Sequence, residues 1–383
     1  GQLLGSQNDM ATIRLAFLQG MVFYGPIATL YRQAQGLSVF DITLIESLCL
    51  ALSVLLEIPW GVLADRLGYR RTMIICCGLY FVSKIIFWQA DGFADFLVER
   101  VLLSVVIAGM SGVDTTILYL SSHPENSQRV FGMYDAMGMA GLVLATLIFS
   151  IWVQDNYRLA AFLTMISYGL AGLCALGLKE VHPVKQSSIS QSSFGQVIKE
   201  VVGNKKLLLL LLAMALLSET HQTITTFLNQ PKYLECGLGE SMIGWVYLVS
   251  TGLGIAGALS AIVTRHLKKL GTVIILGGSY VVACWLLTLT DKATVAIFGI
   301  LLLRLAHTLF QPYLRQCENA MIQTSQRATA LSVNAMGMDG VAIMTNLIFG
   351  AFAKVNLSIA FLFGAMISLL SVVLLSYLAF SKK

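Results

Sequence analysis

The stretch that decides the fold reads GVLADRLGYRR and occupies residues 61–71. It places two glycines, one acid and three arginines between segments that are almost entirely apolar. Gly61 allows two helices to approach closely, Gly68 permits a turn, and Asp65 is placed to meet a helix N-terminus or an arginine. One interpretation is a basic loop that only sets membrane topology, and the other is a working part of the protein.

The composition of the whole chain places this stretch in a membrane protein. Of 383 residues, 57% are hydrophobic and only 12% are charged, about half the charged fraction of soluble proteins. Such a chain cannot cover a water-facing surface with polar groups, which argues against a cytosolic enzyme or a nucleic-acid binder. The seven cysteines are scattered without a C-x-x-C pair, so we expect neither a disulfide framework nor a metal site.

The usual motifs of enzymes are missing from the sequence. It contains no G-x-S-x-G, no Walker A loop and no H-E-x-x-H. We therefore expect no enzyme activity, no catalytic residue, no cofactor and no direct use of ATP.

The apolar stretches predict twelve membrane-spanning helices. A spanning helix needs about 20 apolar residues, so twelve with short loops account for the whole length. We predict them near residues 11–31, 41–63, 72–90, 95–120, 130–152, 157–178, 206–230, 240–264, 271–290, 293–315, 328–350 and 355–380.

The positive charges predict the orientation of these helices. With the N-terminus inside, sixteen of the 25 Lys and Arg residues fall on the inner side and five on the outer side. Inner loops of membrane proteins carry the excess of basic residues. We therefore expect a multi-pass protein of the cell membrane, or of the inner membrane if the source is bacterial, with both termini cytoplasmic.

A sequence repeat divides the chain into halves. Ser127-Gln128-Arg129 recurs as Ser325-Gln326-Arg327, and Ala136-Met137-Gly138-Met139 recurs as Ala335-Met336-Gly337-Met338. The offset places the fifth predicted helix on the eleventh in the same orientation, as in transporters built from parallel repeats. We predict a six-helix half at 1–178, a cytoplasmic linker at 179–205 with a short amphipathic helix near 194–198, and a second six-helix half at 206–383.

Residues 61–71 resemble the G-x-x-x-D-R-x-G-x-R-R signature of the major facilitator superfamily. The resemblance implies an all-α membrane protein of twelve transmembrane helices in two six-helix halves. It also implies a cytoplasmic latch, in which the acid of this loop pairs with the inner end of helix 11 and with nearby arginines. The latch residues carried over are Gly61, Asp65, Arg66, Gly68, Arg70 and Arg71, with Arg129 and Arg327 as candidate partners.

Two further segments resemble a bacterial branch of the superfamily whose members are commonly assigned as exporters. Glu57 lies just before the end of the second predicted helix, and Arg100 and Asp114 lie in the fourth. The fifth helix departs from the best-known drug/proton antiporters, because it lacks the proline of their G-x-x-x-G-P-x-x-G-G motif. The resemblance therefore implies a transporter without implying that antiporter group.

A few charged and polar side chains fall inside the predicted spans. Each ionised group near the bilayer centre costs about 2.5–3.5 kcal/mol, so such groups usually face a cavity or a partner. At 100° per residue, one face of the seventh helix carries a polar stripe of Glu219, Gln222, Thr223, Thr226 and Gln230, which we predict to line the substrate and proton pathway. The other predicted pathway residues are Asp339, Arg304, His307, Asp114, Glu57, Arg100 and Tyr24, where Tyr24-Gly25-Pro26 is expected to kink the first helix.

Structural roles are the alternative for several of these residues. Glu57 and Asp114 can pair with Arg14 or with the cytoplasmic loop, and Arg100 near the outer end of its helix can snorkel to the surface, as can Glu99. Lys84 lies on a helix that is peripheral in the resembled family, so we expect it to reach the lipid side.

The second half of the chain leaves two choices open. Arg304 is expected to pair with Glu219 or Asp339, or to bind an anionic substrate. His221 and His307 are either proton carriers or ordinary hydrogen-bonded residues.

The expected function is secondary transport of a small organic solute by alternating access. The first hypothesis is proton-coupled export of an amphipathic or cationic compound, because a buried carboxylate can bind a proton and a cation in turn. The second is an uptake symporter or facilitator for an anionic metabolite, with Arg304, Arg100 or Arg14 as the clamp. The expected partners are the substrate, protons and the lipid bilayer, with no nucleic acid, and the chain is expected to be a monomer.

Overall fold

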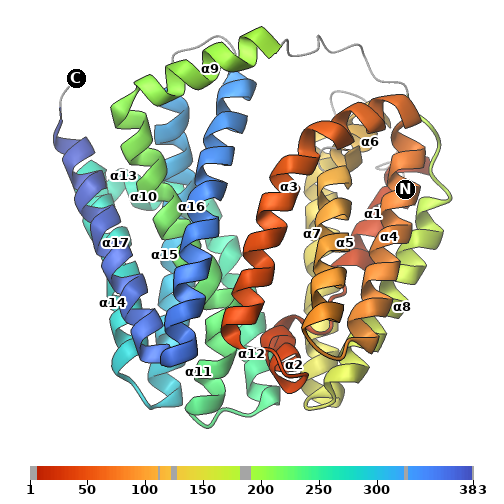
Figure 1. Ribbon diagram of the computed structural model, residues 1–383, viewed down its shortest axis with the longest axis horizontal. Coiled ribbons are helices and arrows are strands. Elements are labelled where there is room, and N and C mark those ends of the chain that lie inside the picture. Colours follow the sequence, from red (N-terminus) through yellow and green to blue (C-terminus); the bar gives the residue numbers. More distant parts are fainter. Residues whose placement is uncertain (1–6, 111–112, 122–126, 182–190, 323–326, 382–383) are drawn as a thin grey trace. The chain divides into compact units, whose positions relative to one another are not determined.

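The computed structural model describes residues 7–110, 113–121, 127–181, 191–322 and 327–381. These residues form helices joined by short connections, and none of them lies in a β-strand (Figure 1). The prediction of an all-α protein is confirmed.

The chain divides into two compact units. The first unit comprises Gly1–Leu37, Leu48–Gln186 and Glu240–Leu248, and the second comprises Ser38–Ser47, Ser187–Gly239 and Val249–Lys383. Helix α3, Val39–Leu67, therefore begins in the second unit and ends in the first. Helix α12, Glu240–Gly252, is likewise shared between them.

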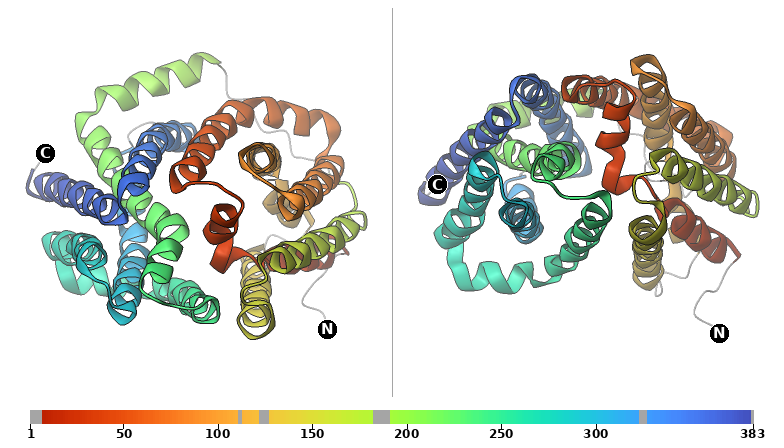
Figure 2. Two further views of the ribbon diagram at one scale, coloured as in Figure 1. Left: turned by 60° about the horizontal axis from the view of Figure 1, so that its bottom comes forward. Right: turned by 90° about the horizontal axis from the view of Figure 1, so that it is seen from below.

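The other helical elements of the first unit surround a core of small and medium-sized apolar side chains. They are α1 Gln7–Gly20, η1 Gly25–Ile27, α2 Ala28–Ala34, α4 Tyr69–Gln89, α5 Phe93–Met110, α6 Val113–Ser121, α7 Ser127–Ile148, η2 Phe149–Val153 and α8 Tyr157–Ala175. Helix α4 packs against α5 and α8, and α1 packs against α7 and α8 (Figure 2). Leu15, Met73 and Ile117 are among the side chains buried where these helices meet.

The second unit also consists of helices that pack on one another. Its other elements are α9 Gln191–Gly203, α10 Lys205–Thr223, η3 Ile224–Leu228, α11 Asn229–Glu235, η4 Leu253–Leu259, α13 Ser260–Thr272, η5 Val273–Gly277, α14 Gly278–Leu289, α15 Ala293–Ala320, α16 Arg327–Val355 and α17 Leu357–Phe380. Helix α14 packs against α15 and α17, and α10 packs against α15, α16 and α17. The elements η2, η3 and η5 are π-helical turns that continue longer helices.

Ten segments of the described residues are long and apolar enough to cross a membrane. In the predicted span 95–120 the described residues 95–110 and 113–120 are helical. This span is not among the ten segments, because Asp95, Glu99 and Arg100 lie close together in α5. The predicted spans 240–264 and 271–290 are also helical. Lys268, with a φ of 62°, interrupts the chain between them, and the apolar segment found there runs from Ser260 to Leu289.

Helix α9 confirms the predicted amphipathic helix and extends it to thirteen residues. Val197 and Val201, one turn apart, are buried against Leu207, Ile322 and Ala330. Lys199 and Glu200 on the intervening positions are exposed. The helix lies across the ends of α10 and α16, which it contacts (Figure 1).

Candidate functional site

The first membrane segment is broken near its middle. Helix α1 ends at Gly20 and helical structure resumes at Gly25, so residues 21–24 leave the helix. Pro26 explains part of the break, since proline donates no backbone hydrogen bond and disfavours helical geometry in the residue before it. The predicted kink at Tyr24-Gly25-Pro26 is confirmed.

Helix α8 supplies hydrogen bonds that the broken segment has lost. The backbone N–H of Phe23 donates to Oγ1 of Thr164 at 3.0 Å. The hydroxyl of Ser167 donates to the carbonyl of Leu18, and the hydroxyl of Tyr168 donates to the carbonyl of Gln19 at 2.8 Å. Positions 164, 167 and 168 share one face of a helix. Broken helices in membranes require such partners, because no water is available to their backbone.

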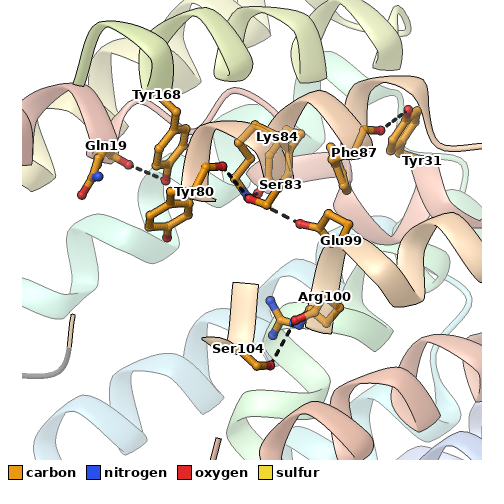
Figure 3. A network of polar contacts seen from close by, with 11 residues as sticks. Gln19, Tyr31, Tyr80, Ser83, Lys84, Phe87, Glu99, Arg100, Ser104 and Tyr168 are labelled. Atoms are coloured by element: carbon orange, nitrogen blue, oxygen red, sulfur yellow. Dashed lines mark hydrogen bonds and ion pairs between the residues drawn. The ribbon is translucent and has the colours of Figure 1, made fainter. Parts of the chain in front are cut away.

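A buried ion pair lies beside the break (Figure 3). Nζ of Lys84 on α4 lies 3.7 Å from Oε1 of Glu99 on α5, and the two side chains are 2% and 1% exposed. The same Nζ donates to the hydroxyl of Tyr24 at 2.5 Å. The prediction that Lys84 reaches the lipid side is therefore wrong, and the alternative in which Glu99 snorkels to the surface is excluded. Each charge avoids lipid because the other neutralises it inside the unit.

Aromatic rings enclose the ammonium group of Lys84. Nζ lies 5.0 Å from the ring centroid of Tyr24, 5.4 Å from Tyr168, 5.5 Å from Tyr80 and 5.9 Å from Phe87. Cations within about 6 Å of an aromatic face are attracted to it, more strongly where water is excluded. The rings of Tyr80 and Tyr168 stack on each other, at 4.5 Å between centroids. We call Tyr24, Tyr80, Lys84, Phe87, Glu99 and Tyr168 the lysine cage.

Two predicted pathway residues lie elsewhere in the first unit. Arg100 follows Glu99 on α5 and is half-buried, and its carbonyl accepts a bond from Ser104 at 3.0 Å (Figure 3). Asp114 on α6 accepts a bond of 2.6 Å from the hydroxyl of Tyr134 on α7. The side chain of Glu57 lies outside the described residues.

Three carboxylates from different helices meet in the second unit. Glu46 of α3 and Asp339 of α16 act electrostatically on Glu219 of α10. Oε2 of Glu219 is buried and has no hydrogen-bond partner among the described residues. The start of α3 reaches α16, where Ser47 donates to the carbonyl of Ile343 at 3.3 Å. We call Glu46, Glu219 and Asp339 the acidic cluster.

The polar stripe predicted on the seventh span is only partly continuous. Gln222 is exposed, whereas Thr223 is buried and donates to Oδ1 of Asn346 on α16 at 2.9 Å. The π-helical turn η3 begins directly after Thr223, which shifts the angular positions of the residues beyond it. Gln230 is buried and donates back to the carbonyl of Thr226 at 3.2 Å. The five residues thus differ in exposure along the helix, and their common role on a pathway stays a prediction.

Two histidines stack on each other next to Arg304. The rings of His221 on α10 and His307 on α15 are 3.7 Å apart between centroids and 3° from parallel. Nδ1 of His307 shares a hydrogen bond of 2.9 Å with the hydroxyl of Tyr280. Nε of Arg304 donates to the carbonyl of Ser250 at 3.2 Å. These contacts turn all three side chains toward neighbouring helices.

The signature loop of residues 61–71 is tied to the end of α8. Gly68 has a φ of 88°, a conformation that favours glycine, and the carboxylate of Glu180 lies against it. Oε1 of Glu180 accepts the backbone N–H groups of Tyr69, at 3.0 Å, and Arg70, at 3.4 Å, which caps the start of α4. The guanidinium of Arg70 donates to the carbonyls of Leu178 and Leu176, at 2.6 and 3.2 Å.

The remaining latch residues are less completely described. Arg66 and Arg71 are exposed. The side chains of Asp65, Arg129 and Arg327 and the surroundings of Gly61 lie outside the described residues, so the latch stays a prediction.

The sequence profile of the Major Facilitator Superfamily matches residues 11–344. The chain belongs to this superfamily. The expected family is confirmed. Among curated proteins, it is 27% identical over 187 residues to the quinolone resistance protein NorA of Staphylococcus aureus, which covers 46% of this chain and 45% of that protein. The chain thus spans about half the length of the curated relatives it matches.

Solved structures of other superfamily transporters share the fold. The nucleoside transporter NupG superposes with a TM-score of 0.80 at 15% identity, covering 98% of this chain and all of that one. A bacterial homolog of the human lysosomal transporter Spinster superposes at 0.73 and 15% identity, covering 99% and 96%. The human organic anion transporter MFSD10 superposes at 0.60 and 14% identity, covering 97% and 99%. At these identities the likeness concerns the fold alone.

Several residues of the described sites escaped the sequence prediction. Glu46 and Glu99 are not among the predicted pathway residues, and Lys84 is predicted to reach the lipid side. Their signal was present, because Lys84 and Glu99 are opposite charges within two predicted spans that follow one another in the chain. Tyr280 carried no signal, since a tyrosine in an apolar helix is ordinary.

Proposed function

We propose that this chain exports a small amphipathic or cationic organic compound across the cell membrane in exchange for protons. The acidic cluster is the observation that supports this function best. Two further negative charges act on Glu219, whose Oε2 is buried, and ionised carboxylates in such a place are costly, so the cluster favours uptake of either a proton or a cation. Proton and substrate then compete for the same negative charge.

The proposed cycle follows from that competition. Substrate binding at the acidic cluster displaces a proton, and the two halves, 1–178 and 206–383, rock about the midplane to expose the site to the other side. Protons entering from outside then return the carboxylates to their neutral form. Glu219 is the proposed shared site, Gln222 the exposed polar wall beside it, and residues 61–71 the cytoplasmic gate.

Similarity supports the direction of transport. The matching half-length relatives are named for quinolone resistance. A protein that confers resistance to a drug by transport removes it from the cell, and we extend export, though no particular drug, to this chain. The proposal also includes a monomer with both termini in the cytoplasm.

Transport by the purified protein tests the proposal. Ethidium, a fluorescent amphipathic cation, is followed in proteoliposomes under an imposed pH gradient, with and without a protonophore. We expect proton-driven ethidium movement in the wild type, loss of it in Glu219→Gln, and normal movement in Glu235→Gln, because Glu235 is exposed at the end of α11. Ethidium movement that the protonophore leaves unchanged would rule out proton coupling.

An anion transporter is the second candidate. The observation in its favour is Arg304, whose side chain lies against Gly254 and the carbonyl of Ser250 within the second unit instead of pointing to lipid. Arg304→Gln separates the two candidates. Carboxylate uptake by the wild type that Arg304→Gln abolishes would favour the anion transporter, whereas no carboxylate uptake by the wild type would favour export of cations.

A further inference from the structure

The ion pair of the lysine cage leaves hydrogen-bonding capacity unused. The 3.7 Å between Lys84 Nζ and Glu99 Oε1 is longer than a hydrogen bond. Oε2 of Glu99 is buried and has no hydrogen-bond partner among the described residues. A carboxylate held in this way keeps its negative charge only through the nearby ammonium group, since no hydrogen bond to Oε2 stabilises the ionised form.

The charged and titratable groups around the pair of Lys84 and Glu99 come from four elements. They are Lys84 and Tyr80 on α4, Tyr24 in the break, Tyr168 on α8, and Tyr31 and Arg32 on α2. Among them, Lys84 is the cation that forms the ion pair with Glu99. On its own helix, Glu99 is followed by Arg100. The charge state of Glu99 therefore depends chiefly on the position of Lys84.

We propose that Glu99 is a second proton-binding site of the transport cycle, with Lys84 as the tethered cation that keeps it ionised. The proposal rests on the proton coupling proposed above. When Lys84 moves away, Glu99 is left buried and alone and takes a proton on Oε2 to become a neutral acid. When Lys84 returns, the proton leaves. By linkage, proton binding at Glu99 also releases Lys84.

The lysine cage can hold the Lys84 ammonium group both when Glu99 is ionised and when Glu99 is protonated. When the ammonium of Lys84 moves away from Glu99, Tyr24 and the aromatic rings remain as partners for it, because they favour a cation without requiring an anion. Tyr24 belongs to the broken part of the first span, at residues 21–24. A displacement of this segment therefore moves the hydroxyl to which Lys84 is bound, which links the proton site to a conformational change.

Infrared difference spectroscopy of the reconstituted full chain tests the proton site directly. The probe is the proton alone, titrated over about pH 4 to 9 while the C=O stretch of protonated carboxyl groups is recorded. We expect Glu99→Gln to remove one component of this band. Lys84→Met is expected to move that component to higher pH by about one unit or more, as for a carboxylate that loses an opposite charge, and Lys84→Arg to leave it close to the wild-type position.

The outcomes separate this inference from the proposed function. A titrating band that is unchanged in Glu99→Gln, or unmoved in Lys84→Met, would overturn the proton site. The double variant Lys84→Met/Glu99→Gln, which carries no unpaired charge, replaces either single variant that fails to fold, and must lack the same component. Proton-driven ethidium movement is measured in the same liposomes. Its absence in the wild type would defeat the proposed function, whereas its presence with unchanged pH dependence in Glu99→Gln would defeat this inference alone.

Discussion

The backbone N–H of Phe23 donates to Oγ1 of Thr164 at 3.0 Å, so that a hydrogen bond lost where the first span unwinds is replaced by one from α8. This bond is buried and joins residues 141 positions apart in the chain. It shows how the sequence can tolerate four non-helical residues inside a membrane segment.

Thr164→Val is therefore expected to destabilise the protein by about 1–3 kcal/mol, because it keeps the shape of the side chain and leaves the Phe23 N–H without an acceptor. Thermal unfolding in detergent measures the loss. Ser279→Ala is the matched control, since the Ser279 hydroxyl bonds the Ile275 carbonyl of its own helical segment. Equal stability of the two variants would mean that the bond to α8 contributes nothing.

The ion pair of the lysine cage gives a prediction about stability that is independent of transport. Lys84→Met or Glu99→Gln alone should cost about 3–5 kcal/mol, because each leaves a buried charge unpaired, and the double variant should regain much of that loss. The free energies of unfolding of the wild type, the two single variants and the double variant give the coupling energy of the pair directly. Lys205→Met, at an exposed lysine, should change little. Additive losses in the double variant would show that the two charges do not stabilise each other.

The glycines of the sequence repeat should differ sharply in their tolerance of alanine. A Cβ at Gly141 would overlap the carbonyl of Phe17 on α1, whereas one at Gly138 would lie 3.9 Å from the Ala16 carbonyl, and one at Gly340 has nothing within 4 Å. We expect Gly141→Ala to lower the yield of folded protein severely and Gly340→Ala to leave it unchanged. Size-exclusion profiles of the fluorescently tagged variants compare them. Similar profiles would argue against close packing of α1 on α7.

The turn at Gly68 should also reject a side chain. With a φ of 88° and the Glu180 carboxylate close by, Gly68→Ala is expected to cost about 1–2 kcal/mol from backbone strain, while Gly203→Ala, at a site with open space, should not. Shortening Glu180 in Glu180→Ala should remove the cap of α4 at a cost of about 0.5–2 kcal/mol. Thermal unfolding compares the stabilities of Gly68→Ala, Gly203→Ala and Glu180→Ala. A neutral Gly68→Ala would contradict the left-handed turn.

Gln222 and Thr223 are neighbours with different expected roles. Thr223→Val leaves Oδ1 of Asn346 without its donor and should lower stability by about 1–3 kcal/mol. Gln222→Ala, at an exposed position, should leave stability unchanged and raise the ethidium concentration needed for half-maximal transport. Unfolding and transport measured on both variants decide this. The reverse pattern would place Thr223, not Gln222, on the substrate pathway.

Much of the fold was predictable because it depends on composition and period. Apolar runs separated by basic loops identified the helices, and Pro26 identified the break in the first span. The interruption at Lys268 and the π-helical turn after Thr223 were not predictable, since neither a lysine nor Ile224-Thr225-Thr226 carries a local signal for such geometry. A count of 100° per residue does not hold across that turn, so angular positions beyond it could not be read from the sequence alone.

The site was harder to predict than the fold for a physical reason. A charge in a span must be neutralised, but the sequence does not say by which residue. Lys84 and Glu99 lie 15 positions apart, and only the packing of α4 against α5 shows that they meet. Glu219 was identified because it stands in a Leu-rich segment, where a single acid is conspicuous. Glu46 could be assigned to the acidic cluster only from the structure, in which the start of α3 contacts α16.

The bonds between the first span and α8 also provide a reference distance within the protein. Leu18, Gln19 and Phe23 are hydrogen-bonded to Ser167, Tyr168 and Thr164, so we expect these two segments to move together. Spin labels on their exposed faces would keep a constant separation throughout the cycle. Distances between other pairs of spin labels on this protein can then be compared with that constant one.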